Sequence, residues 1–210
     1  MAHPLLKFSL FTYTGDEVDD HETWQRLPAD LRDVLRHTNG LVAYRGGFHL
    51  RGAVLDPAWH AISTVWDGAL SLHRAYSDLR DTDVPFAQDA LGDQYLLRDA
   101  RVVRLWAETG DVEPLHITLA HFLTRVAAVP YQSLHIQPLQ RFQDAGGQLR
   151  PGQLLRADPP FCLPQDGAVA LEAVDAGQRI FSLATLSLNL PVTVTLEGID
   201  LVEVARRRRT

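Results

Sequence analysis

The sequence predicts an α+β protein in which helices pack against a twisted, largely antiparallel sheet, with a further α+β extension toward the C-terminus. Two observations support this prediction. Residues 94–97 and 101–108 form two strand-like runs joined by a tight turn, and three other segments repeat apolar residues at helical spacing. With 210 residues, 46% of them hydrophobic and 22% charged, the chain can bury a substantial core.

The N-terminal elements are expected in the order strand, loop, helix, strand. Residues 5–13 are apolar and predict an opening strand, which gives way to an acidic loop at residues 15–22. A helix should follow, because Pro28 suits its first turn and apolar residues then recur at helical spacing until Asn39 and Gly40 end it. A short strand is expected at residues 48–51.

The second helix is predicted to begin near residue 56, where Asp56 can cap it and Pro57 can occupy its first position. An apolar stripe would line one face: Trp59, Ile62, Trp66 and Leu70. Such a stripe could border a cofactor pocket, but aromatic residues at helical spacing are more often part of a core. The core interpretation is therefore preferred.

The clearest hairpin joins the two runs at 94–97 and 101–108 through Asp99 and Ala100, and the edges of the sheet are expected here. A third helix should open at Glu113 and Pro114 and end at residues 129–130, because apolar residues recur at helical spacing between them. A shorter helix is expected around residues 139–142. We regard Gly40 and Gly92 as positions where the backbone needs a positive φ.

Glycine and proline interrupt the chain from residue 146 onward, before strand candidates at 169–174 and 192–196. Residues 180–188 are apolar enough for a buried helix, and 199–204 could add a last strand. The expected organisation is therefore a domain at 1–130, an extension at 131–205 packed on it, and a basic tail at 206–210.

No motif of three large enzyme classes is present. The chain lacks a Gly-x-Ser-x-Gly elbow, a phosphate-binding loop and a Gly-x-Gly-x-x-Gly turn, and it has no His-Glu-x-x-His pair for zinc. We therefore expect no catalytic residue, no metal site and no cofactor. The single cysteine, Cys162, is expected to be a small core residue rather than a nucleophile.

No apolar run approaches the length that spans a bilayer, and residues 1–10 lack the features of a signal peptide. A cytoplasmic protein without membrane contact is therefore expected. The formal net charge is −6, and the four arginines at 206–209 leave −10 for the rest of the chain. An acidic body disfavours nucleic acid and favours a basic protein partner.

Two acidic stretches are the candidate partner-binding residues. They could form solvated loops, a recognition surface or an acid/base site, and neither has the glycine and glutamate positions of a calcium-binding hand. Their members are Asp16, Glu17, Asp19, Asp20 and Glu22 in the first stretch, and Asp78, Asp81, Asp83, Asp89 and Asp93 in the second.

Several segments carry a resemblance to a known family. Residues 24–31, continuing to Thr38, Asn39 and Gly40, look like the first helix of proteins of the SUKH superfamily, which follows a Leu-Pro pair and ends at Asn-Gly. Residues 84–89 and 92–97 resemble the family's strand entry, and 102–103 with 108–110 resemble its next strand and turn. The spacing Phe-x-x-Asp-x-x-Gly-Asp-Gln is most similar to the GAD-like members.

The resemblance implies a SUKH-like mixed fold and a role in binding another protein. GAD-like members occur as immunity proteins of type VI secretion and other interbacterial toxins, so it implies a protein that neutralises a cognate bacterial toxin by occlusion. An acidic body would suit a nuclease toxin, whose phosphate-binding surface is basic. The alternatives are a housekeeping interaction protein in cell-wall or regulatory assembly, and a hydrolase using the acidic groups or Cys162.

Overall fold

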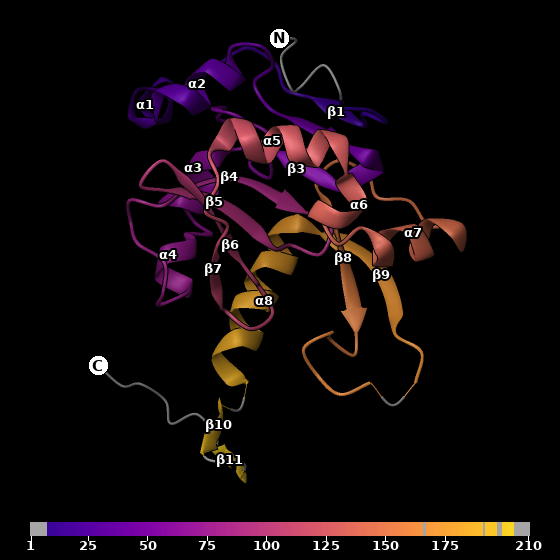
Figure 1. Ribbon diagram of the computed structural model, residues 1–210. Helices are drawn as coiled ribbons and strands as arrows, with labels where there is room; N and C mark the ends of the chain where they lie inside the picture. Colours follow the sequence, from indigo (N-terminus) through magenta and orange to yellow (C-terminus); the bar gives the residue numbers. More distant parts are fainter. Residues whose placement is uncertain (1–7, 166, 191, 197–198, 204–210) are drawn as a thin grey trace.

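A seven-stranded antiparallel sheet forms the centre of the computed structural model, which describes residues 8–165, 167–190, 192–196 and 199–203 (Figure 1). The strands lie in the sheet in the order of the chain, so each neighbour is joined by a direct connection. They are β1 (Tyr13–Thr14), β2 (Leu41–Ala43), β3 (Phe48–Leu50), β4 (Val84–Asp89), β5 (Gln94–Arg98), β6 (Arg101–Leu105) and β7 (Val112–Pro114). The predicted α+β class is confirmed.

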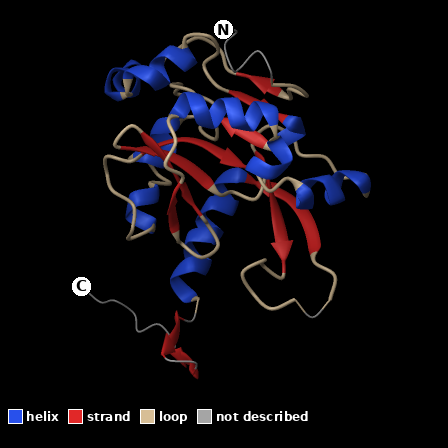
Figure 2. Ribbon diagram, in the orientation of Figure 1, coloured by secondary structure: helices blue, strands red, loops and turns tan. Residues whose placement is uncertain are grey.

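Helices cover both faces of this sheet (Figure 2). Because side chains alternate along a strand, Tyr95 and Leu97 of β5 enter one apolar cluster while Leu96 enters the other. The first cluster includes residues of α2 (Ala29–Leu35), α5 (Leu119–Ala128) and α7 (Gln137–Asp144), and the second includes residues of α4 (Leu72–Ala75) and α8 (Ala176–Asn189). The remaining helices are α1 (His21–Arg26), α3 (Ile62–Trp66), α6 (Pro130–Ser133) and the 3₁₀ turn η2 (Tyr44–Gly46).

The C-terminal part contributes to both clusters. Strand β8 (Gln153–Asp158) pairs with β9 (Ala170–Asp175), and the Leu155 N–H donates to the Ala90 carbonyl at 2.7 Å. Leu155 enters the first cluster and Leu154 the second. The remaining pair of strands, β10 (Val192–Leu196) and β11 (Ile199–Glu203), forms a hairpin of its own.

Most of the predicted elements are confirmed: α2, β3, the β5–β6 hairpin, α7, β9, α8, β10 and β11. Asp99 and Ala100 both have positive φ, 50° and 60°, which is the backbone of a two-residue hairpin turn. The predicted sheet edges are wrong, because β5 and β6 have a partner on each side and the outer strands are β1 and β7. Helix α8 is buried on one face only, since Phe181 and Leu188 are exposed.

Four predicted element boundaries are also wrong. Of the expected opening strand, residues 5–7 lie outside the described residues, and only Tyr13–Thr14 pairs in the sheet. The helix expected from Asp56 begins at Ile62, because residues 58–60 form a turn and Ala61 is bridged to Gly52 before the helix starts. The acidic loop predicted at residues 15–22 ends at residue 20, because α1 begins at His21.

The third helix begins later than predicted, at Leu119 instead of Glu113. Glu113 pairs with Arg104 in the sheet and belongs to β7. Thr118 then caps α5, its side chain accepting from the N–H of His121 at 3.3 Å. A proline that suits the first turn of a helix is equally compatible with the edge of a sheet, which is where Pro114 lies.

Gly40 is expected to be a position where alanine is costly. Its φ is +88°, and an added Cβ would lie 2.4 Å from Cε1 of His60 and 2.6 Å from the Leu50 carbonyl oxygen. We expect Gly40→Ala to lower the free energy of unfolding by about 2 kcal/mol or more, measured by urea denaturation. Gly146→Ala is the matched control, because it has the same φ with nothing within 4 Å. Equal losses in the two variants would contradict the steric argument.

Candidate functional site

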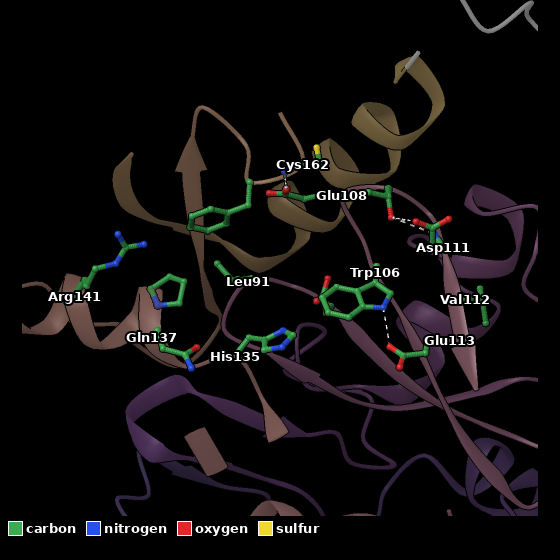
Figure 3. A pocket seen from close by; sticks show the side chains of 14 residues that line it. Leu91, Trp106, Glu108, Asp111, Val112, Glu113, His135, Gln137, Arg141 and Cys162 are labelled. Carbon is green, nitrogen blue, oxygen red and sulfur yellow. Dashed lines mark hydrogen bonds between the residues drawn. The ribbon is translucent and has the colours of Figure 1, made fainter. Parts of the chain in front are cut away.

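A cavity of about 700 Å³ lies where the sheet meets the C-terminal part of the chain (Figure 3). Its volume lies in the range of small-molecule and side-chain pockets. Four chain segments border it: the turn between β4 and β5, the connection from β6 to β7, the chain around α7, and the loop between β8 and β9. The cavity therefore depends on residues that are far apart in the sequence.

The walls of the cavity are mainly apolar. Leu91 comes from the β4–β5 turn, Trp106 from the β6–β7 connection, Val112 from β7, Pro138 from α7 and Phe161 from the β8–β9 loop. Trp106 and Phe161 supply flat aromatic surfaces, against which an apolar or delocalised cationic group can stack.

Four carboxylates border the same cavity, and they differ in how they are paired. Asp93 lies 2.5 Å from Arg104, and Glu108 lies 3.3 Å from Arg179 and accepts from the Cys162 N–H at 2.8 Å. Asp111 and Glu113 are exposed, and neither has a basic partner within ion-pair distance among the described residues. These two carboxylates therefore present uncompensated charge to the cavity.

Asp111 and Glu113 are nevertheless held in place by neutral donors. The Thr109 hydroxyl donates to Asp111 at 2.7 Å, and Nε1 of Trp106 donates to Glu113 at 3.0 Å. Both donors and Asp111 belong to the β6–β7 connection, and Glu113 lies in the adjoining strand β7 (Figure 3). These hydrogen bonds fix the orientation of the two carboxylates without neutralising their charge.

A buried ion cluster supports the cavity from behind. Nη2 of Arg104 lies 2.5 Å from Asp93 and 3.3 Å from Asp89, and the guanidinium stacks 3.6 Å from the ring centre of Trp106. Burial and the neighbouring Asp93 raise the pKa of Asp89 well above its usual range. The cluster orients Asp93 and Trp106, both of which line the cavity.

His135 is held in one tautomer by this cluster. Nη2 of Arg104 donates to Nδ1 of His135 at 2.9 Å, so the ring proton must lie on Nε2. Burial and the charge of Arg104 lower the pKa of His135, which favours the neutral ring at pH 7. The imidazole can therefore offer a single N–H donor.

Cys162 is half-buried at the cavity wall rather than part of a core cluster. Burial, followed by the charge of Glu108, raises the pKa of its thiol to about 11. A thiol with such a pKa stays protonated at neutral pH, and the thiolate is the reactive form. The predicted place of Cys162 in the core is therefore wrong, and that it is not a nucleophile stays a prediction.

Four of the ten acidic residues predicted to bind a partner are buried, so they cannot form an open recognition surface: Asp20, Asp83, Asp89 and Asp93. Asp20 caps α1, accepting from the Thr23 N–H at 3.0 Å. Asp83 pairs with Arg98 through both oxygens, at 2.9 and 2.6 Å, and Asp89 and Asp93 pair with Arg104. The remaining six are exposed: Asp16, Glu17, Asp19, Glu22, Asp78 and Asp81.

Asp93 is the only one of the ten that borders the cavity. Sequence reasoning missed Glu108, Asp111, Glu113 and His135. One signal was present in the sequence, because the Thr109-Gly110 turn has an acidic residue on each side and Trp106 just before it. Such a turn brings its flanking residues to one end of a hairpin.

Among the described residues, no helix is long and apolar enough to cross a membrane. Within the same part of the chain, no group of three histidine, cysteine, aspartate or glutamate side chains is arranged to hold a metal ion.

No protein-family model matches the chain, and no curated protein sequence does so either. A solved structure, the crystal structure of Atu4351 from Agrobacterium tumefaciens, has a similar fold with a TM-score of 0.60. The match covers 97% of this chain and 98% of that chain at 15% sequence identity. At this identity the likeness shows the fold alone, and this chain shares that fold over nearly its whole length.

Proposed function

We propose that this protein is a non-catalytic binding module that holds a basic protein partner at the acidic cavity. The more specific form of the proposal is an immunity protein of the bacterial cytoplasm that neutralises a cognate toxin by occlusion. One observation carries the proposal: Asp111 and Glu113 stand beside apolar walls with no basic partner among the described residues.

The combination suits protein recognition for a physical reason. Unpaired carboxylates attract a basic surface from a distance and speed its association, while the apolar walls supply the contact area that holds it. The acidic body of the chain adds a field of the same sign. The resemblance to SUKH proteins supports the immunity form, because members of that superfamily bind toxins.

The test begins with the protein encoded beside this one in its native genome, and with capture of partners from the native host. Once a basic partner is in hand, we expect the Asp111→Asn, Glu113→Gln pair to slow association about tenfold at low salt, because steered association depends on such charges. The on-rate should also lose part of its salt dependence. Stopped-flow fluorescence at several ionic strengths measures both.

The exposed loop acids provide the comparison. Asp78→Asn with Asp81→Asn removes the same charge from the second acidic stretch. A larger effect from this pair than from the cavity pair would move the binding face to that loop. Capture of a cell-wall or regulatory assembly protein, with no toxin bound, would contradict the immunity form and favour the housekeeping alternative.

A further inference from the structure

The cavity carries opposite charges at its two ends. Arg141 and Gln137 of α7 lie at one end, Asp111 and Glu113 lie at the other, and Leu91 lies between them (Figure 3). Arg141 is exposed and has no ion-pair partner among the described residues. The two charged ends therefore face the same cavity without neutralising each other.

A ligand that matches this order has an anionic group, an apolar middle and a cationic group. An arginine residue at the C-terminus of a peptide chain has all three, because its α-carboxylate and its guanidinium are separated by three methylene groups. The guanidinium is favoured over the ammonium of lysine, since its flat face can stack on an aromatic wall and its donors can serve two carboxylates at once.

We propose that the cavity binds the C-terminal arginine of a partner chain, with the carboxylate at Arg141 and Gln137 and the guanidinium at Asp111 and Glu113. The proposal rests on the proposed function and names the group that the basic partner would insert. Free arginine fits less well, because its α-ammonium would lie beside Arg141 without a carboxylate to pair with. The volume of about 700 Å³ also leaves room for the preceding residue of a peptide.

The test is a calorimetric titration of the full chain with N-acetyl-alanyl-arginine bearing a free carboxylate. Two matched probes each lack one charge: the C-terminal amide, and the citrulline peptide, in which a neutral urea replaces the guanidinium. We expect each probe to bind about tenfold more weakly or worse, because a charged hydrogen bond contributes that much. Equal binding of either probe would overturn the proposal.

Substitutions at the two ends should act separately. Arg141→Gln is expected to weaken the acid peptide toward the affinity of its amide, while Asp111→Asn with Glu113→Gln weakens it toward the affinity of the citrulline peptide. The controls are Arg74→Gln and the pair Asp30→Asn, Asp56→Asn, which remove the same charges from exposed positions outside the cavity. Controls that weaken binding as much as the cavity variants would overturn the proposal.

The four arginines at 206–209 share the guanidinium of the probe but not its free α-carboxylate, so they can compete for the acidic end of the cavity or bind the carboxylate of the probe. The titration is therefore repeated after changing all four to glutamine. Unchanged or tighter binding of the probe supports the cavity as the site. Loss of binding would show that the probe had bound to the four arginines, and it would overturn the proposal.

The two proposals fail separately. If the peptide does not bind but the Asp111, Glu113 pair still slows association with a captured partner, the arginine-terminus proposal falls and the binding module stands. If the peptide binds as expected and no protein partner is found, the assignment of a terminal arginine to the cavity stands and the proposed function is contradicted.

Discussion

Arg104→Met is expected to lower the free energy of unfolding by about 3–5 kcal/mol, the largest loss that we predict for a single substitution. The Arg104 side chain is 7% exposed and is the only ion-pair partner of Asp89 and Asp93 among the described residues. Its removal leaves two buried carboxyl groups with no counter-charge, and methionine replaces its volume but not its donors. Urea denaturation followed by tryptophan fluorescence measures the change.

The control for this prediction removes the carboxylates together with the arginine. The triple variant Arg104→Met, Asp89→Asn, Asp93→Asn should recover part of the lost stability, because no uncompensated charge remains buried. A triple variant that is no more stable than Arg104→Met would contradict the charge argument and point to lost packing against Trp106.

The two aspartates should also differ from each other. Burial and the neighbouring Asp93 raise the pKa of Asp89, so the charged form of this carboxyl is disfavoured in the folded protein and the neutral amide of Asp89→Asn should be tolerated better there. Asp93 lies closer to Arg104 and also accepts from the Ala107 N–H at 2.8 Å. We therefore expect Asp93→Asn to cost more stability than Asp89→Asn, in the same denaturation measurement.

Local patterns explain which elements of the fold could be predicted from the sequence. The turn at Asp99 and Ala100 and the apolar spacing of α5 depend on residues close together in the chain, so their signals are visible without a structure. The helix starts predicted at Asp56 and Glu113 are wrong because backbone pairing with distant residues determines the structure there. Gly52 is bridged to Ala61 just before the first helix, and Arg104 pairs with Glu113 at the second start.

The candidate site could not be predicted in the same way, because charged residues were assumed to be exposed. Asp83, Asp89 and Asp93 are buried and form ion pairs with arginines of strands β5 and β6. The spacing of the acids in the sequence does not reveal these partners. Arginines within strand-like runs were the missed signal. A buried charge needs a partner, so an arginine there indicates a buried acid nearby.

Acid is expected to destabilise the protein through a buried chain of two histidines. The Gln88 amide donates to Nδ1 of His49 at 3.1 Å, Nε2 of His49 donates to Nδ1 of His60 at 2.8 Å, and Nε2 of His60 donates to the Asn39 carbonyl at 2.8 Å. Since the Asn39 carbonyl only accepts and the Gln88 amide nitrogen only donates, each ring carries one proton, on Nε2, and both rings are neutral. A proton added to either ring would place two donors face to face.

Burial lowers the pKa of both rings, to about 4 for His60 and well below 6.5 for His49. As the pH falls below 6.5, the two histidines therefore bind protons in the unfolded chain before they do so in the folded protein. Their contribution to stability is fully present above pH 6.5 and is lost as the pH falls toward the pKa values of the folded protein. His60 alone should lower the free energy of unfolding by about 3 kcal/mol between pH 6.5 and pH 4, and His49 should add to this loss.

Asp89 works in the opposite direction, because a carboxyl whose pKa is raised in the folded protein adds stability as the pH falls toward 3.8. The denaturation series is therefore run on Asp89→Asn as well, where the loss in acid should be steeper than in the unchanged protein. Imidazole nitrogen chemical shifts give a second measurement that needs no substitution. Rings of His49 and His60 that titrate near pH 6.5 would contradict the prediction, since a fixed chain of donors cannot accept a proton without breaking.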